Sequence, residues 1–99
     1  MQRLDSLKES SQLHGFVHGR VQGVFFRKFV YGKAKELGLT GWVRNLSNGA
    51  TVEIVAQGQK NSLQALIKSL YAGPSGAYVE RVEVRWENPE ISQLVFRIK

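Results

Sequence analysis

The sequence predicts an α+β fold, the ferredoxin-like βαββαβ sandwich, in which two helices lie on one face of a mostly antiparallel sheet of four or five strands. Strand-like alternation and helix-like spacing follow one another in that order, and a short extra strand ends the chain. An Asn-Gly pair separates the two middle strands, as in a hairpin. The 99 residues, 42% of them hydrophobic, suffice for one domain and leave no room for a second.

The N-terminal part contains a polar segment followed by the first strand. Residues 1–12 are rich in Ser, Gln and charged side chains, so we expect a flexible tail there and a single domain over residues 13–99. Residues 13–19 alternate as a strand does, with Leu13 and Val17 on one face.

A helix is predicted over residues 26–37. Its apolar stripe recurs at spacings of four, four and three: Phe26, Val30, Ala34 and Leu37. Gly38 is expected to cap the helix, whereas Gly32 inside it costs about 1 kcal/mol relative to alanine. We predict a helix because the apolar stripe outweighs the cost of this glycine.

A hairpin follows the first helix. Residues 40–46 and 51–57 both have strand character, and Asn48-Gly49 between them can adopt the positive φ angles of a hairpin turn.

A second helix and two strands complete the chain. The helix is expected to use Asn61 as its N-cap, to end at Gly73-Pro74, and to place four apolar residues on one face: Leu63, Leu66, Ile67 and Leu70. Residues 78–86 then alternate strictly. The last strand, residues 94–98, is expected to place three residues on one side: Leu94, Phe96 and Ile98.

Charge and composition exclude several classes of function. The formal net charge of +6 favours an anionic partner, such as nucleic acid, acidic lipid or a small phosphorylated molecule. The chain has no cysteine, which excludes disulfides and thiolate nucleophiles, and its one aspartate, Asp5, lies in the expected tail. No segment reaches the roughly 18 apolar residues of a membrane-spanning helix, and the start is too polar for a secretory signal, so we expect a cytoplasmic protein without membrane contact.

Two histidines and one aromatic residue on the first strand raise alternatives. His14 and His18 share a face without a third ligand nearby in sequence, and we interpret them as ordinary sheet residues rather than zinc ligands or a phosphorylated nucleophile. An RNA-binding module on this fold would carry stacking aromatics on its first and third strands. Only Phe16 meets that requirement, which disfavours nucleic acid as a partner.

The loop between the first strand and the first helix, GRVQGVFFRK, suggests a binding site. Backbone N–H groups of such a loop and of a helix's first turn have no helical partners and suit an anion. Arg27 can reach back over the loop, since helical side chains lean toward the N-terminus, whereas Lys28 is expected to be solvated. From spacing alone, a second interpretation is equally open: the glycines only form a tight turn between strand and helix, and Arg27 is a solvated surface residue.

The same loop resembles a family signature. GRVQGVFFR is similar to the acylphosphatase pattern Gly-x-Val-Gln-Gly-Val-x-Phe-Arg at every specified position. The similarity continues through ELGLTGWVRN, GATVEIVAQG and GPSGAYVERVEV, and so covers nearly the whole chain after Leu13.

The resemblance implies a hydrolase that converts acyl phosphates to carboxylate and inorganic phosphate without a cofactor or metal. It implies that Arg27 binds the phosphoryl group and that Asn45 orients the attacking water. The loop amides it implies as phosphate ligands are those of Gly19, Arg20, Val21, Gln22, Gly23 and Val24. This chemistry agrees with the residue inventory, because a carboxylate leaving group needs no general acid and positioning with charge stabilisation can carry catalysis.

One departure from the family pattern concerns the hairpin. The segment NLSNGATVE has about one residue more than the pattern, and such an insertion flips the next strand unless a β-bulge absorbs it. We expect a bulge near Gly49 or Ala50, with a possible effect on the placement of Asn45. A monomeric enzyme is the favoured interpretation; a non-catalytic phosphate-binding or RNA-binding module on the same fold is the alternative.

Overall fold

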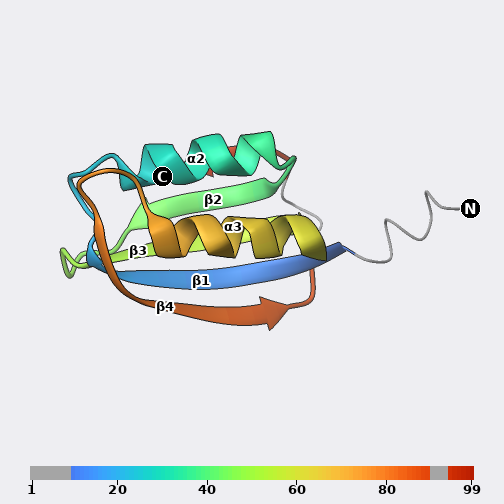
Figure 1. Ribbon diagram of the computed structural model, residues 1–99. Helices are drawn as coiled ribbons and strands as arrows, with labels where there is room; N and C mark the ends of the chain where they lie inside the picture. Colours follow the sequence, from blue (N-terminus) through green and yellow to red (C-terminus); the bar gives the residue numbers. More distant parts are fainter. Residues whose placement is uncertain (1–9, 90–93) are drawn as a thin grey trace, which may run out of the picture.

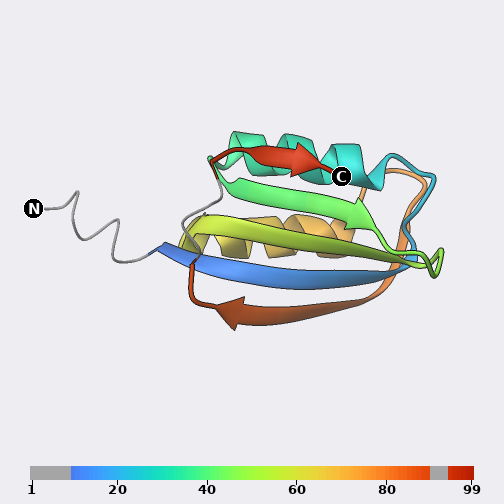
Figure 2. The same ribbon diagram turned by 180° about the vertical axis from the view of Figure 1, so that it is seen from behind.

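The fold is a five-stranded sheet covered by two helices on one side. The computed structural model describes residues 10–89 and 94–99. Its elements are β1 (Ser10–Arg20), α2 (Phe26–Glu36), β2 (Thr40–Asn45), β3 (Thr51–Gln59), α3 (Lys60–Ala72), β4 (Tyr78–Glu87) and β5 (Phe96–Ile98). Figure 1 shows α2 and α3 side by side on one face of the sheet, and Figure 2 shows the opposite, helix-free face. The predicted α+β ferredoxin-like fold is confirmed.

The strand order is β4-β1-β3-β2-β5. β1 pairs antiparallel with β3 and β4, β2 pairs antiparallel with β3, and β5 pairs parallel with β2. The sheet is therefore mostly antiparallel, as expected. The parallel pairing brings the C-terminal segment beside β2, where no local sequence signal would place it.

The core lies between the helices and the sheet. Alternation along the strands and the apolar stripes of the helices supply its buried residues: Leu13, Val17, Val21, Phe26, Val30, Ala34, Leu39, Val43, Val52, Ile54, Ala56, Leu63, Leu66, Leu70 and Phe96. Both predicted helical stripes are thus confirmed in their main residues. Among the described residues, neither helix is long and apolar enough to cross a membrane.

The first strand begins earlier than its composition indicated. Ser10 already pairs with Gln59, so residues 10–12, which we expected in the tail, continue β1. Gln12 is only 3% exposed, and its Nε2 donates to Glu87 Oε1 at 2.9 Å. Ser10 and Gln12 fit here because they lie on the same face as His14, opposite the core residue Leu13; residues 1–9 of the expected tail lie outside the described residues.

The helix ends agree only in part with the sequence. At the end of α2, Gly38 has φ +71° and its N–H donates to the Lys35 carbonyl, while the Leu39 N–H donates to that of Ala34, which confirms the predicted glycine cap. For α3, the predicted N-cap Asn61 is wrong. Gln59 at the end of β3 is the N-cap and lacks a side-chain cap bond, because the strand runs directly into the helix.

The hairpin accommodates its extra residue without a bulge at the expected place. β2 and β3 pair in continuous register from Thr40 with Gln57 to Asn45 with Val52, so the predicted bulge near Gly49 or Ala50 is wrong. The turn absorbs the residue, since Asn48 Oδ1 accepts from the Ala50 N–H at 2.9 Å and Gly49 takes φ +77°. A register shift occurs instead between β1 and β4, at His18 and Gly19.

The last strand is shorter than predicted. Only Phe96–Ile98 pairs with β2, and of the three residues expected on one side only Phe96 is buried. Leu94 is 83% exposed and Ile98 44% exposed, because the strand lies at the sheet edge.

The helix-free face carries a network of ion pairs. His14 Nε2 lies 2.7 Å from Glu53 Oε2, and His14 Nδ1 lies 3.2 Å from Glu87 Oε2. Arg44 Nε donates to Glu53 Oε1 at 2.6 Å, and His18 Nε2 lies 2.8 Å from a carboxylate oxygen of Glu83 on β4. Both histidines therefore act as sheet residues, as interpreted from the sequence. In the described part of the chain no cluster of three or more His, Cys, Asp or Glu side chains could hold a metal ion.

Glu53 gives this network a pH dependence. Burial would raise the pKa of Glu53, but hydrogen bonds from His14 and Arg44 outweigh burial and lower it below its ordinary value of 4.5. A lowered folded pKa stabilises the fold above the unfolded value, and this contribution is lost as the pH falls through the folded value.

We predict that Glu53→Gln lowers the free energy of unfolding at pH 7 by about 1–3 kcal/mol, because the carboxylate that is hydrogen-bonded to His14 and paired with Arg44 is lost. The difference from the unmodified chain should shrink as the pH falls below about 4.5, where Glu53 itself becomes protonated. Urea unfolding at several pH values measures both effects, with the exposed Glu80→Gln on β4 as control. A difference that stays constant from pH 7 to pH 3 would contradict the assigned ion pairs.

Candidate active site

The loop between β1 and α2 starts at a glycine that no other residue can replace without strain. Gly19 has φ +138°, and a Cβ there would collide with the backbone carbonyl of Tyr78. Its N–H donates to the Ala50 carbonyl at 3.0 Å, so this amide is engaged by the β2–β3 turn. Gly19 therefore anchors the start of the loop to the hairpin, and its amide is already engaged in this structure.

The amides that follow have no acceptor. None of the backbone N–H groups of residues 21–25 donates a hydrogen bond within the part of the chain that the structure describes. Gly23 at φ +75° and Phe25 at φ +61° turn this segment into a tight curve, and Phe25 is the N-cap of α2. Successive amides in such a curve, next to the positive end of a helix dipole, form a site for an anion.

Gln22 contacts the hairpin rather than a ligand. Its Nε2 donates to the carbonyl of Leu46 at 2.8 Å and to the carbonyl of Thr51 at 2.9 Å, on either side of the turn. The side chain thus ties the loop to the end of β2. We assign Gln22 a positioning role, which the sequence signature alone did not distinguish from binding.

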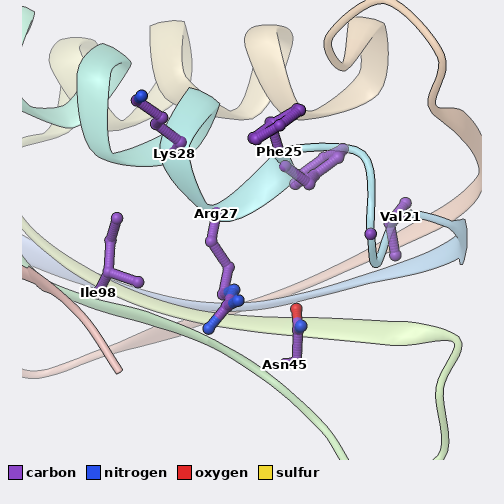
Figure 3. A pocket seen from close by; sticks show the side chains of 8 residues that line it. Val21, Phe25, Arg27, Lys28, Asn45 and Ile98 are labelled. Carbon is purple, nitrogen blue, oxygen red and sulfur yellow. The ribbon is translucent and has the colours of Figure 1, made fainter.

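A cavity of about 280 Å³ opens where the loop, α2, β2 and β5 meet. It is lined by Val21, Gly23, Phe25, Phe26, Arg27, Lys28, Asn45 and Ile98. Figure 3 shows Arg27 pointing from α2 toward Asn45, which points back from β2. Arg27 Nη1 donates to the Lys99 carbonyl at 3.0 Å, so the guanidinium is held at the cavity by the C-terminal segment.

Asn45 lies on the helix side of the sheet at the end of β2. It pairs with the buried Val52 and, two residues after the buried Val43, shares the face of that residue. The continuous β2–β3 register keeps Asn45 on this face despite the longer turn. Its Oδ1 is buried and has no hydrogen-bond partner within the described residues. A buried acceptor without a partner is costly in a folded protein and indicates a place where a water or ligand binds.

The structure brings together half of the predicted site residues at the cavity. Four of them line it: Val21, Gly23, Arg27 and Asn45. The other four, Gly19, Arg20, Gln22 and Val24, are not lining residues, although the amides of Gln22 and Val24 belong to the run without acceptors in the described structure. Arg20 is the exposed end of β1, opposite Tyr78, and Val24 packs against the core.

Four lining residues were not predicted: Phe25, Phe26, Lys28 and Ile98. Phe25 and Lys28 flank predicted positions, and Lys28, expected to be solvated, is exposed yet borders the cavity with its ammonium directed away from Arg27 (Figure 3). Ile98 reaches the site through the parallel pairing of β5 with β2, for which the sequence has no signal.

Comparison with known proteins identifies relatives over nearly the whole chain. The family model described as Acylphosphatase matches residues 13–98. An acylphosphatase of Chloroflexus aurantiacus is 51% identical over 86% of this chain and 91% of its own length, and one of Roseiflexus sp. is 44% identical over 93% and 98%. The solved structure of an acylphosphatase from Coxiella burnetii has a TM-score of 0.85 and 42% identity, covering 95% of this chain and 97% of that one.

We predict that Gln22→Met, which keeps the approximate shape but removes both donors, lowers the free energy of unfolding by about 1–3 kcal/mol. It should also speed amide hydrogen exchange at Gly19, whose bond to Ala50 depends on the same loop–hairpin contact. Urea unfolding and exchange measured by NMR test this, with Gln64→Met on the exposed face of α3 as matched control. Unchanged stability and exchange would show that the two bonds do not hold the loop.

Proposed function

The chain belongs to the acylphosphatase family and hydrolyses acyl phosphates to carboxylate and inorganic phosphate, and we propose that the cavity between the 21–25 loop, Arg27 and Asn45 is where it does so. The observation that carries the proposal is the run of loop amides at residues 21–25, which have no acceptor among the described residues and lie beside Arg27 at the cavity. Together they offer N–H donors and one formal positive charge to a phosphoryl group.

Arg27 and the loop amides supply the binding. A guanidinium presents a planar pair of donors that matches two phosphoryl oxygens, and the backbone amides of the loop can meet the remaining ones. Charge-assisted hydrogen bonds contribute roughly 1.5–3 kcal/mol each, so a two-point contact of Arg27 amounts to about 3–6 kcal/mol. If that contact strengthens as charge spreads over the phosphoryl oxygens in the transition state, it accounts for a rate factor of about 10²–10⁴.

Asn45 supplies the orientation of the nucleophile. Its Oδ1, buried and without a partner among the described residues, can accept a hydrogen bond from a water molecule. An amide is not basic enough to take the proton, so the role is to place the water oxygen for attack in line with the leaving group.

The reaction needs no acid from the protein. The water oxygen attacks phosphorus, the bond between phosphorus and the acyl oxygen breaks, and its electron pair leaves on the carboxylate. Because that carboxylate is a stable anion, the departing oxygen requires no proton, and the proton of the water passes to a phosphoryl oxygen or to bulk water. This is consistent with the described lining of the cavity, which contains no carboxylate, histidine or cysteine side chain, and we propose that the enzyme works without a metal or other cofactor.

An RNA-binding module on the same fold remains the second candidate considered from the sequence. The helix-free face of β3 carries Thr51, Glu53 and Val55 rather than stacking aromatics, and Glu53 adds negative charge there. This arrangement supports our proposal that nucleic acid is not a partner.

We also propose that the protein acts as a cytoplasmic monomer, and that its catalytic domain, expected to begin at residue 13, already begins with β1 at Ser10.

Arg27→Ala is expected to lower kcat/KM for acetyl phosphate by about 10²–10⁴ and to weaken inhibition by inorganic phosphate, because binding and charge stabilisation both lose the guanidinium. Steady-state kinetics with and without phosphate measure this, with the exposed Lys35→Ala on the same helix as charge-matched control. Wild-type activity of the Arg27→Ala variant would exclude the proposed phosphate-binding site.

Asn45→Ala is expected to reduce kcat by about 100-fold while the inhibition constant of phosphate changes by less than about threefold, since the side chain orients water rather than binding phosphate. Thermal unfolding should be preserved, because Oδ1 has no partner to lose within the described residues. Equal losses in turnover and phosphate inhibition would instead make Asn45 a binding residue.

A further inference from the structure

The hydrogen bond that holds Arg27 depends on the end of a short edge strand. Arg27 Nη1 donates to the main-chain oxygen of Lys99 at 3.0 Å, and among the described residues this is the only hydrogen bond of the guanidinium. Lys99 directly follows β5, which has three residues and lies along β2 (Figure 2). An arginine side chain has many rotamers, so a guanidinium that is fixed in place needs an acceptor that is also fixed.

The described contacts hold the two ends of β5 unequally. At its start, Phe96 is 4% exposed and belongs to the core. At its end, Ile98 is 44% exposed, the side chain of Lys99 is exposed, and the Lys99 N–H donates to the Val43 carbonyl at 2.8 Å. The ends of short elements open readily where little surface is buried. A further contact at Lys99 therefore helps to keep the acceptor of Arg27 in place.

Trp42 supplies that contact from the helix-free face of the sheet. It precedes the buried Val43 on β2, so its side chain lies on the face opposite the core. Lys99 Nζ lies over its ring, 4.3 Å from the ring centroid. Attraction between a cation and an aromatic face acts within about 6 Å, and tryptophan gives the strongest contact of this kind. Within the described residues the Lys99 ammonium has no ion pair, so the ring is its partner.

The ring of Trp42 also contacts the ion-pair network of the helix-free face. Arg44 Cζ lies 5.2 Å from the ring centroid, and Arg44 Nε donates to the buried Glu53 at 2.6 Å. A continuous series of contacts, through Trp42 and Lys99, therefore connects this ion pair with the guanidinium of Arg27 on the other side of the sheet.

We propose that Trp42 is a positioning residue for the hydrolysis, which acts through Lys99 on the guanidinium of Arg27. The proposal rests on the function proposed above, since it affects catalysis only if Arg27 binds the phosphoryl group. Trp42 does not line the cavity, so its effect passes through the main-chain oxygen that accepts from Arg27. A guanidinium that is already held in place loses less side-chain entropy when the phosphoryl group binds.

The first test measures steady-state kinetics with acetyl phosphate. Lys99→Met keeps the stem of the side chain and removes the cation, and Trp42→Leu removes the ring. Each is expected to lower kcat/KM, and to raise the inhibition constant of inorganic phosphate, by about two- to fivefold, the factor that a cation–aromatic contact contributes at an exposed site. Lys99→Arg and Trp42→Phe, which keep a cation and an aromatic face, should recover most of the loss.

A second tryptophan–lysine pair provides the matched control. Lys60 Nζ lies 4.8 Å from the ring centroid of Trp86, and neither residue lines the cavity. Lys60→Met and Trp86→Leu should leave both constants unchanged. Equal losses in these variants and in those of Trp42 and Lys99 would make general destabilisation the cause and would overturn the proposal.

A second readout observes the Arg27 side chain directly. In the protein without phosphate, the heteronuclear NOE of Arg27 Nε, measured by NMR, should fall in Lys99→Met and stay unchanged in Lys60→Met, because the guanidinium becomes more mobile only in the first. An unchanged NOE in Lys99→Met would overturn the proposal. Wild-type kinetics of Lys99→Met beside an inactive Arg27→Ala would overturn it as well, whereas wild-type kinetics of Arg27→Ala would instead exclude the proposed catalytic site.

Discussion

The attachment of the 19–25 loop to the end of the β2–β3 hairpin is the constraint on which the site depends. One backbone bond, from Gly19 to Ala50, and two side-chain bonds from Gln22 connect the two segments. These bonds use polar groups at the edges of the loop and leave the amides of residues 21–25 without acceptors in the described structure. Because the hairpin also carries Asn45, the same contacts fix the position of Asn45 relative to the loop amides.

The two faces of the sheet are covered in different ways. The helix face buries the core, while the helix-free face is covered by its own polar side chains, with Glu53 buried between His14 and Arg44. Such paired charges replace the apolar cover that a layer of helices would give, since buried charges are tolerated when paired and hydrogen-bonded. The loop of residues 21–25 lies at one end of the sandwich, and its backbone N–H groups have no acceptor in the described structure.

The sequence was sufficient for the fold class, and it named two side chains, Arg27 and Asn45, that both line the cavity. Periodicity located the strands and helices because burial on one face imposes it, and the family resemblance supplied Arg27 from the loop motif and Asn45 from GWVRN. It did not separate binding from positioning within the motif, because Gln22 and Gly19 act through partners on the hairpin that are more than 20 residues away. It also failed for Ile98, whose place at the cavity follows from a parallel strand pairing without a local signature.

Three unfavourable features occur together at this cavity: loop amides and the buried Oδ1 of Asn45, both without partners among the described residues, and the left-handed Phe25. Each costs folding free energy, and proteins remove such costs elsewhere in their structures by pairing polar groups or by using glycine. In the function that we propose, a bound phosphoryl group satisfies the amides and its attacking water satisfies Oδ1. Such a reaction requires little reorganisation, because donors and acceptor are held in place before the substrate arrives.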